Sequence, residues 1–440
     1  MGERRMIFCA TGDTILTKPL DRNYPGFEEL CSFLNKADVR MNNMEIVLAD
    51  YDCCASTYCG TPWLCTSPKA LDELRAFGFD CYSIANNHTL DYFYTGLRST
   101  LEAFRTRGIP CSGAGESLDE ATRACKVRTE KGTLALLALT TTSDDSARAG
   151  EAMGPFPARP GVSKLRHSER YYVSEEQMRV LQRIAEDTAI NGRADNSRAG
   201  GYLPTKPGVF FFGPSEFSVG TPGKKSVPNA ADMERYEKAV SAAAEESDHT
   251  IVYVHTHEIP AMSDDEPDLF VEAFAHACID WGADAVICSG THQVKGVEFY
   301  SGKPIFYSIA NFIFQLDGSK YYPAEWYDRF GIDRSLDARA GEYVRSRGGT
   351  IGLETESYCY RSIAPVLEWD DQGNLIRVAA KPLGLGFDGS AEYKGLPRFA
   401  NESETALLLE AIRRLSLPYG TEVEMGEDGM MVFTERKQLA

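Results

Sequence analysis

Long hydrophobic runs are missing from this sequence, and their absence restricts how the protein can meet a membrane. No apolar segment approaches the roughly 20 residues that a helix needs to cross a bilayer. Residues 1–9 have neither the apolar stretch of roughly 7–15 residues nor the small-residue cleavage site of a secretory signal. We therefore expect a cytoplasmic protein without a membrane segment.

Positive charge is also in short supply. Lys and Arg number 46 against 64 Asp and Glu, which gives a formal net charge of −18. Nucleic acids and anionic membrane surfaces attract proteins mainly through Lys and Arg. We therefore expect no nucleic acid partner, and we infer that the chain acts on a small molecule or on a peptide or polymer. The composition leaves the oligomeric state open.

Paired CxxC knuckles are absent, although the chain has 12 cysteines. The densest group, within residues 53–65, lacks the ligand spacing of a structural zinc site. Other cysteines, such as Cys9 and Cys288, lie inside apolar runs, where cysteine packs as a small hydrophobic residue. We therefore expect free thiols in a reducing compartment.

Short apolar runs alternate with amphipathic stretches along most of the chain. Hydrophobic residues make up 43% of the 440 residues, which is enough for a large core. We predict strands at residues 5–10, 46–49, 79–84, 133–139, 249–254 and 284–288, and helices at residues 27–34, 94–107, 230–246 and 268–281. This alternation predicts a layered α/β sandwich.

The alternation of apolar runs and amphipathic stretches is weaker in two parts of the chain, and from these we predict the domain organisation. We predict one main α/β domain over residues 1–345. Residues 141–228, rich in Gly and Pro, are expected to form an insertion over the site, with a mobile loop at residues 191–207. Residues 321–347 show only weak periodicity. Residues 346–440 are expected to supply strands and a helix that pack on the same domain.

Polar side chains follow several of the predicted strands. In open α/β sheets, ligands bind beyond the carboxyl ends of the strands, so these side chains are candidates for one site. The candidates are Asp13, Glu45, Asn87, His88, His255 and His292. A carboxylate beside a buried strand, such as Glu45, costs free energy unless it is paired or bound to a metal ion. Oxygen and nitrogen ligands without thiolates suit Mn, Fe, Zn, Mg or Ca, and we predict one or two divalent ions.

The run Ala85-Asn86-Asn87-His88-Thr-Leu-Asp91 is more specific than any single residue. It places two amides, an imidazole and a carboxylate between a predicted strand and the following helix, and core packing does not account for that density of polar groups. The spacing of His88 and Asp91 lets the carboxylate orient the imidazole and raise its basicity. We predict His88 and Asp91 as catalytic residues and Asn86 as a substrate contact.

A second group of polar residues follows the strand at 249–254. Of His255 and His257, we expect only one to be a ligand facing the site, and we predict His257 and Glu258 as substrate contacts. In the expected insertion, Arg159 and Arg166 could bind an anionic substrate. Alternatively, each of the two could be a surface arginine that does not contact the substrate.

The motifs together resemble a known family. They are Gly12-Asp13, Asn43-Met44-Glu45, Ala85-Asn86-Asn87-His88 with Asp91, His255, and the long run from Gly290-Thr-His292 to Phe314-Gln315. In this order they resemble the CapA-type poly-γ-glutamate capsule-biosynthesis proteins of the calcineurin-like metallophosphatase superfamily. The resemblance covers roughly residues 5–385 and implies a four-layer αββα sandwich with a metal site at the strand ends.

The resemblance also implies a ligand set. Asp13 would be the carboxylate of the first strand, and Glu45 would stand where the superfamily often has a bridging Asp. Asn87 would be the amide ligand. His255 and His292 would be the late histidine ligands.

The chain departs from the two-metal phosphatase pattern at two positions. Gly12-Asp13-Thr14-Ile15 lacks the second histidine of Asp-x-His, and Ser289 stands where the resemblance would place a histidine. His88 keeps the position of the catalytic histidine. The sequence therefore leaves two interpretations open: a centre with two metal ions, or a single metal ion held largely by oxygen ligands.

Three functions follow from these observations. The first is metal-dependent hydrolysis of a phosphoester or amide-type bond, linked to poly-γ-glutamate or capsule biosynthesis. The second is metal-assisted epimerisation of a peptide, in which His88 with Asp91 and His292 with Asp13 act as two bases. The third is a non-catalytic role in polymer binding or assembly. We expect the first.

Overall fold

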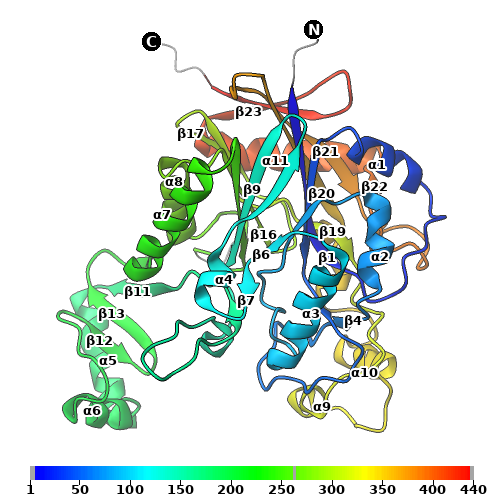
Figure 1. Ribbon diagram of the computed structural model, residues 1–440. Coiled ribbons are helices and arrows are strands. Elements are labelled where there is room, and N and C mark those ends of the chain that lie inside the picture. Colours follow the sequence, from blue (N-terminus) through cyan, green and yellow to red (C-terminus); the bar gives the residue numbers. More distant parts are fainter. Residues whose placement is uncertain (1–4, 261–263, 437–440) are drawn as a thin grey trace.

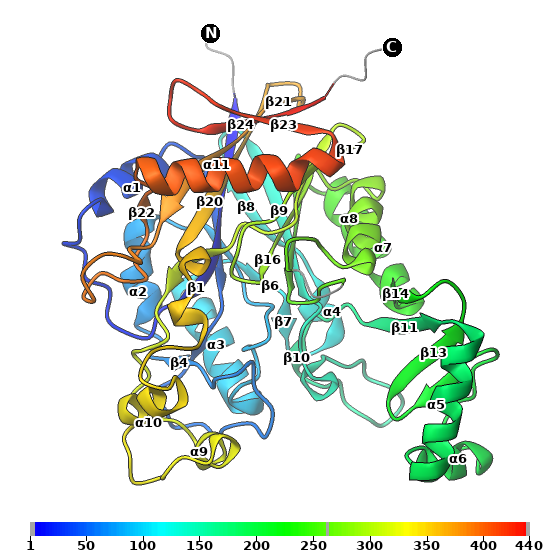
Figure 2. The ribbon, with the colours of Figure 1, turned by 180° about the vertical axis from the view of Figure 1, so that it is seen from behind.

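Two large β-sheets form the centre of this mixed α/β protein (Figures 1 and 2). They are seen in a computed structural model that describes residues 5–260 and 264–436. Residues 1–4, part of the segment in which we looked for a secretory signal, lie outside the described residues. Within the described ranges, no helix has the length and apolar character needed to span a bilayer.

The first sheet has ten strands, with four neighbouring parallel strands at one side. In spatial order its strands are β23 (Thr421–Met425), β24 (Met431–Glu435), β21 (Leu375–Gly384), β20 (Arg361–Trp369), β1 (Met6–Ile15), β2 (Val39–Met44), β5 (Cys81–Ser83) and β6 (Cys111–Ser112), while β19 (Asn311–Phe314) also pairs with β1 and β22 (Arg398–Phe399) with β21. Strand β20 joins β1 in antiparallel orientation. The C-terminal strands therefore extend the sheet that the N-terminal strand begins.

The second sheet has six strands. Its order is β17 (Val297–Tyr300), β18 (Lys303–Phe306), β16 (Ala285–Gly290), β15 (His249–Thr256), β9 (Gly132–Thr140) and β8 (Cys125–Thr129). The four inner strands are parallel, and β8 and β17 close the edges in antiparallel orientation. The predicted strands at 133–139, 249–254 and 284–288 are confirmed, because continuous apolar runs are typical of parallel strands buried on both faces.

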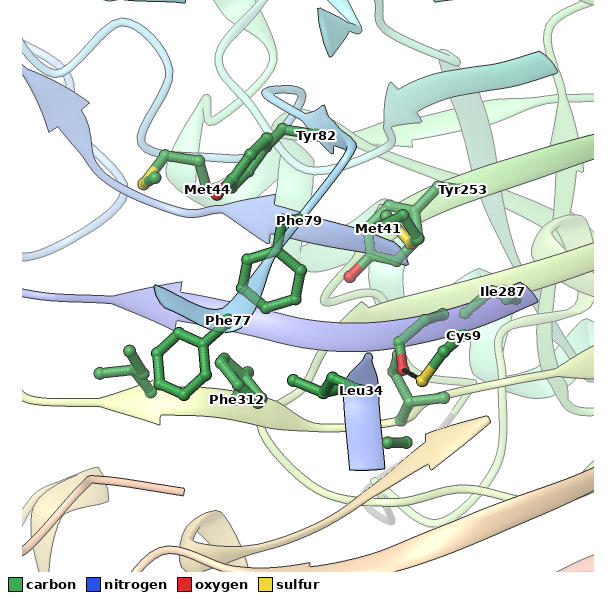
Figure 3. Packing of buried hydrophobic residues seen from close by; sticks show 14 of the residues in the cluster. Cys9, Leu34, Met41, Met44, Phe77, Phe79, Tyr82, Tyr253, Ile287 and Phe312 are labelled. Carbon is green, nitrogen blue, oxygen red and sulfur yellow. Dashed lines mark hydrogen bonds between the residues drawn. The ribbon is translucent and has the colours of Figure 1, made fainter. Parts of the chain in front are cut away.

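Residues of β15 show how the two faces of the second sheet are used. Ile251 and Tyr253 belong to the core shared with the first sheet, whereas Val252 and Val254 pack toward the helices on the outer face. Successive side chains of a strand point to opposite faces, which produces this division. Figure 3 shows Tyr253 beside Met41 of β2. The two sheets therefore pack face to face.

Helices cover the outer faces of both sheets. In Figures 1 and 2, α1, α2 and α3 lie outside the first sheet, and α7 and α8 lie outside the second. Helix α11 lies across one end and contacts both sheets through β21 and β17. The bounds are α1 (Phe27–Leu34), α2 (Ala70–Leu74), α3 (Phe93–Arg107), α4 (Leu118–Thr122), α7 (Ala230–Glu245), α8 (Leu269–Asp280) and α11 (Glu402–Ser416).

A separate arm projects from the body beside the second sheet (Figure 1, lower left). It is built from a four-stranded sheet, β12 (Phe210–Phe212), β13 (Ser215–Val219), β11 (His167–Val173) and β14 (Gly223–Pro228), with α5 (Glu175–Thr188) and α6 (Gly192–Ala199). The loop expected at 191–207 contains α6, so that expectation was wrong. The side chain of Asn191 binds the backbone of Phe211, and Arg198 lies over the Phe211 ring, so contacts with a later strand order this segment.

The weakly periodic stretch 321–347 also folds into helices, α9 (Ala324–Phe330) and α10 (Ala338–Arg345). Trp326 of α9 packs in one apolar cluster with Trp63 and Val47. The remaining short elements are the strands β3 (Val47–Leu48), β4 (Cys65–Thr66), β7 (Ala114–Gly115) and β10 (Gly161–Val162), and the 3-10 helices η1 (Arg75–Phe77), η2 (Asp145–Ala147), η3 (Leu353–Thr355), η4 (Ser357–Tyr360) and η5 (Leu417–Tyr419). The helices α9 and α10 cover the carboxyl ends of the first sheet's parallel strands.

Two strand boundaries near the candidate residues differ from the prediction. Strand β1 does not end at Ala10: it continues to Ile15, with a shift in its pairing with β2 between Ala10 and Asp13. This extension is possible because β19 pairs with the last residues of β1. The sequence predicts a core strand at 46–49, after Glu45. The core strand is instead β2, which ends just before Glu45, and the run at 46–49 forms only the short β3. Both corrections place Asp13 and Glu45 at the carboxyl ends of parallel core strands.

Gly12 allows β1 and β19 to approach closely. A Cβ atom at this position would lie 1.7 Å from the carbonyl oxygen of Ala310. We expect Gly12→Ala to lower the free energy of unfolding by about 3 kcal/mol, because the two backbones must separate. Urea unfolding measures the change. Gly192→Ala, whose nearest contact is 3.9 Å away, is the control and is expected to be neutral or slightly stabilising. Equal midpoints for Gly12→Ala and the wild type would contradict this account.

Candidate metal centre

Five ionisable side chains converge beyond the carboxyl ends of the parallel strands. Their potential ligand atoms form two groups, Glu45 with His255 and His257, and Asp13 with Glu45 and His292, and within each group the atoms lie within 4.8 Å of one another. Glu45 belongs to both groups. His257 is half-buried and the other four are buried. This set could hold one ion, or two ions that share Glu45.

The imidazole of His255 lies close to three of the other side chains. Its Nε2 lies 2.7 Å from Oδ1 of Asn87, 3.1 Å from Nε2 of His257 and 3.3 Å from Oε1 of Glu45. The expectation that only one of His255 and His257 would face the site was wrong. Residues i and i+2 of an extended segment lie on the same side, so both imidazoles reach the centre.

Glu45 has the most unusual environment of the set. Its side chain is 0% exposed, and neither carboxylate oxygen has a hydrogen bond to any group in residues 5–260 or 264–436. A buried carboxylate without hydrogen bonds is costly, and a divalent cation would offset that cost. The residues present therefore fit a metal ion.

Asp13 is held by donors from two strands, β2 and β16. Its carboxylate accepts hydrogen bonds from the Asn43 amide at 2.7 Å, the Ser289 hydroxyl at 2.5 Å and the Gly290 N–H at 3.0 Å. Burial alone would raise the pKa of Asp13, but the nearby His255 and the other donors hold it below its usual value. Asp13 is therefore a carboxylate fixed in orientation.

Ser289 does not leave a gap where a histidine was expected. Its hydroxyl donates to Asp13 and accepts a hydrogen bond of 2.6 Å from the Tyr253 hydroxyl. Both residues are buried. The serine therefore serves to position Asp13, a role that sequence reasoning missed, as it also missed Tyr253 and Asn43. Asn43 stood in a quoted motif, but Tyr253 lies in an apolar strand and gave no signal.

His88 and Asp91 form a dyad at the edge of the centre. Nδ1 of His88 lies 2.7 Å from Oδ2 of Asp91, and Asp91 also accepts the N–H groups of Gly60 at 2.9 Å and Leu64 at 2.8 Å. Burial lowers the pKa of His88, but the Asp91 carboxylate outweighs that effect and raises it. Because Nδ1 is bonded to Asp91, Nε2 is the nitrogen available to a substrate.

His292 is oriented by an amide rather than by a carboxylate. Its Nδ1 lies 2.8 Å from Oδ1 of Asn311, whereas Oδ2 of Asp13 is 4.0 Å away. Its backbone φ of +56° is unusual for a residue with a side chain, and it follows Gly290 with a φ of +120°. This turn lifts the imidazole from the end of β16 toward the other ligands.

A cavity of about 320 Å³ opens onto these residues. Asn87, His88, His257 and His292 line one side. The facing side comes from the segment 316–354, which sequence reasoning did not assign to the site, and includes Trp326, Phe330, Glu342, Arg345 and Glu354. Nε of Arg345 lies 2.5 Å from Glu342, and its Nη2 lies 2.5 Å from Glu354.

Four predicted substrate contacts lie away from this cavity. Asn86 donates to the Met44 carbonyl, and Glu258 accepts from the hydroxyls of Thr142 and Thr256. The other two are Arg159, which donates to the Arg148 carbonyl, and Arg166, which is bidentate with Asp232. The structure does not bring these four side chains to the 320 Å³ cavity, so their role as substrate contacts stays a prediction.

The ion pair of Arg166 suggests a test of stability. Asp232 is 0% exposed and also accepts from Arg235 at 2.6 Å. Burial raises its pKa, but the bond to Arg166 outweighs that effect and holds the pKa below its usual value. We expect Asp232→Asn to lower the free energy of unfolding by about 2 kcal/mol at pH 7. A group with a depressed pKa stabilises the fold above its unfolded value of about 4, and that contribution is lost as the pH falls below it.

Urea unfolding at pH 7 and pH 3 measures both parts of this prediction. The difference between wild type and Asp232→Asn should shrink at the lower pH. Asp119→Asn, which changes an 83% exposed carboxylate paired with Arg123, is the control and should change stability by less than about 0.5 kcal/mol. A pH-independent difference for Asp232→Asn would contradict the ionic origin of the effect.

The sequence of this chain is similar to that of several known bacterial proteins. Residues 7–316 match the family described as "Bacterial capsule synthesis protein PGA_cap". The chain is 30% identical over 430 residues to the uncharacterized protein y4sH of Sinorhizobium fredii, covering 94% of this chain and 90% of that protein. It is 23% identical over 290 residues to the PGA biosynthesis protein CapA of Bacillus subtilis, covering 66% of this chain and 53% of that protein.

The chain thus spans about half the length of the Bacillus subtilis protein. Among solved structures, a phosphatase from Mycoplasma pneumoniae superposes with a TM-score of 0.41 at 9% identity, covering 86% of this chain and 94% of that chain.

Proposed function

This chain belongs to the bacterial capsule synthesis protein PGA_cap family, and from that membership and the geometry of the centre we propose that it is a metal-dependent hydrolase acting on a phosphoester or amide-type bond. The observation that carries the proposal is the unsatisfied, fully buried carboxylate of Glu45 among three histidines and Asp13. The nearest charged partner of its carboxylate is Nε2 of His255 at 3.3 Å, a nitrogen that is itself a candidate metal ligand.

The fold is part of this proposal. Two sheets with parallel inner strands pack face to face and carry helices outside, which supports the four-layer αββα sandwich of the calcineurin-like metallophosphatases. In this proposal residues 1–345 form the metallophosphatase-like domain, with 141–228 as its insertion, and residues 346–440 form flanking strands and a helix. The pairing of β20 with β1 supports treating that flank as part of the same domain.

The ligands of the proposed ion follow from the distances. They are Asp13, Glu45, Asn87, His255, His257 and His292. When bound, a divalent ion supplies Lewis acidity toward an oxygen of the scissile bond and lowers the pKa of a water molecule. Ser289, Asn43 and Asn311 hold Asp13 and His292 in place for that role.

His88 supplies the proton transfer. Asp91 fixes the Nδ1–H tautomer, so Nε2 faces the cavity and can pass a proton to the departing oxygen or nitrogen. The Asp91 carboxylate raises the pKa of His88, which favours the protonated imidazole that a general acid requires. The Asp91 carboxylate, fixed by two backbone N–H groups, keeps the ring in that orientation.

The geometry favours hydrolysis over epimerisation. The epimerase interpretation relies on His292 paired with Asp13 as its second base. Nδ1 of His292 is 2.8 Å from the Asn311 amide oxygen and 4.0 Å from Asp13, so its hydrogen-bond partner is the amide. The buried His88–Asp91 dyad, whose imidazole lines the same cavity as His257 and His292, favours catalysis over polymer binding alone.

The relatives suggest the setting of the reaction. The Bacillus subtilis relative is named a PGA biosynthesis protein, and a relative from Bacillus anthracis, 20% identical over 335 residues, is named a capsule biosynthesis protein. We therefore propose that the substrate of this chain belongs to the synthesis of poly-γ-glutamate or of another capsule polymer.

Metal analysis and a generic substrate test the proposal together. The protein is purified without chelator, its metal content is measured by mass spectrometry, and hydrolysis of an aryl phosphate and an aryl amide is assayed with Mn, Fe, Zn, Mg and Ca. We expect one or two ions per chain, with hydrolysis abolished by EDTA and restored by one of the metals. A protein that binds no ion and whose stability is indifferent to EDTA would contradict the proposal. Deuterium uptake at a peptide Cα without hydrolysis would indicate epimerisation instead.

A further inference from the structure

We propose that a second cavity, separated from the metal centre by Asn87, binds a protonated amine carried by the substrate. The cavity has a volume of about 150 Å³. Asn87 lines both this cavity and the 320 Å³ cavity. The consequence for substrate choice rests on the proposed hydrolytic function, whereas the binding of an amine follows from the lining of the cavity alone.

The size of the second cavity limits its occupant. A cavity of about 150 Å³ has room for a small molecule of the size of benzene. A short aliphatic stem with a small head group fits within that volume. An occupant that also reached past Asn87 would be an extended molecule with two distinct ends.

Three aromatic side chains line this cavity. They are Tyr58, Phe93 and Tyr94, of which Tyr58 and Phe93 are 52% and 41% exposed, whereas Tyr94 packs partly against the core. The exposed rings of Tyr58 and Phe93 are accessible to a ligand, and aromatic faces attract cations through their negative quadrupole.

The backbone that carries the exposed ring of Phe93 has an unusual conformation. Phe93 has a φ of +48°, a left-handed conformation that is rare for bulky side chains. Such strain persists only where neighbouring contacts impose it, and it is frequent at binding sites. The N–H of Phe93 donates to the Leu90 carbonyl, which closes the turn between the dyad residue Asp91 and helix α3.

The charge of the lining selects for a cation. Asp144 is the one charged side chain among the residues that line this cavity, all of which lie in the described ranges. Hydrogen bonds from Ser146 hold the pKa of Asp144 below its usual value, so the carboxylate is ionised at neutral pH. Lys164, which also acts on Asp144, is engaged with Asp145 at 3.0 Å. A carboxylate beside aromatic faces binds an ammonium group and repels an anion.

The position of Asn87 connects the two cavities. Its Oδ1 accepts from His255 in the metal centre, and its Nδ2 donates to the Gly60 carbonyl. A substrate with its ammonium group beside Phe93 and Asp144 would extend past Asn87 toward His88. The substrate class that fits is a phosphoester or amide whose alkyl chain carries a primary amine.

Direct binding of n-butylammonium tests the second cavity without any assumption about catalysis. Dissociation constants are measured by ligand-observed NMR at fixed ionic strength and fixed metal content, with butyrate as the anionic comparison and 1-butanol as the neutral one. We expect the ammonium to bind at least about tenfold more tightly than butyrate, and Asp144→Asn and Phe93→Ala each to weaken it by about tenfold.

Two matched variants control for the acidic surface. Asp119→Asn removes the same charge from an 83% exposed side chain that does not line this cavity, and Phe156→Ala removes a 72% exposed ring elsewhere. Both should bind n-butylammonium as the wild type does. Equal binding of butyrate and n-butylammonium, or equal effects of Asp144→Asn and Asp119→Asn, would overturn the inference.

Kinetics separate this inference from the proposed function. A series of ω-aminoalkyl phosphates is compared with alkyl phosphates of the same length. We expect the amine to lower KM at one chain length by about tenfold, and Asp144→Asn to abolish that advantage. Hydrolysis of both series with equal KM values would overturn the inference and leave the proposed function standing. Asp144-dependent binding of n-butylammonium without hydrolysis of any phosphoester or amide would support the inference and contradict the proposed function.

Discussion

Glu45→Gln is expected to lower the affinity of the protein for a divalent metal ion by about 100-fold or more. Glu45 belongs to both groups of potential ligands, so an amide at this position weakens the binding of any ion that the centre can hold. Competition with a chelator of known affinity measures the change. Glu298→Gln is the matched control, because Glu298 is a largely buried carboxylate that pairs with His276 and Tyr307 outside the centre. An unchanged affinity in Glu45→Gln would remove the main support for a metal centre.

The same measurement has a defined dependence on pH. Burial lowers the pKa of His255, but the carboxylates of Glu45 and Asp13 outweigh it and raise the pKa to about 10. A metal ion must displace that proton, so the apparent affinity should rise with pH, roughly tenfold per unit, until the pH reaches about 10. Glu45→Gln removes the carboxylate that contributes most to the raised pKa, and the rise should therefore end at a lower pH.

His88→Gln is expected to reduce kcat for a hydrolysed ester by about 100- to 10 000-fold while the metal content stays unchanged. The loss reflects proton transfer by Nε2, which glutamine cannot perform. Asp91→Asn should have a smaller effect, because it leaves the imidazole in place but removes the carboxylate that orients it at 2.7 Å. Steady-state kinetics with measured metal occupancy provide the test.

A second histidine supplies the control for this prediction. His276 pairs with Glu298 at 2.9 Å on the outer helix α8, and His276→Gln should retain the wild-type kcat. The proton-transfer role of His88 is wrong if His88→Gln keeps kcat within about threefold of the wild type at equal metal content. A loss of both kcat and bound metal would instead assign His88 to the ligand set.

The sequence was most informative where local pattern and burial agree. The apolar runs that form β9, β15 and β16 are buried on both faces, so their composition alone predicts parallel core strands. Because such strands end at one edge of a sheet, the polar residues that follow them could be expected to meet. The structure brings Asp13, Glu45, Asn87, His255 and His292 together at that edge.

The far wall of the cavity could not be predicted in this way. Helices α9 and α10 are only 7 and 8 residues long, and Trp326 of α9 packs against short segments distant in sequence, such as those of Trp63 and Val47. Ser289 and Tyr253 were missed for a related reason. Their hydrogen bonds to Asp13 join three different strands, and spacing along the chain carries no information about such contacts.

The pairing of β1 with β19 near Gly12 has a consequence for folding during synthesis. Asp13 is synthesised early, yet its partner Ser289 follows 276 positions later, and β20 must still be added beside β1. Such distant pairings close slowly, and they cannot form on a chain that is still short. A nascent chain therefore has Asp13, Glu45 and Asn87 but no pocket around them. We expect this protein to take up metal only after the ribosome has released most of the chain, so that the metal supply acts on the finished fold.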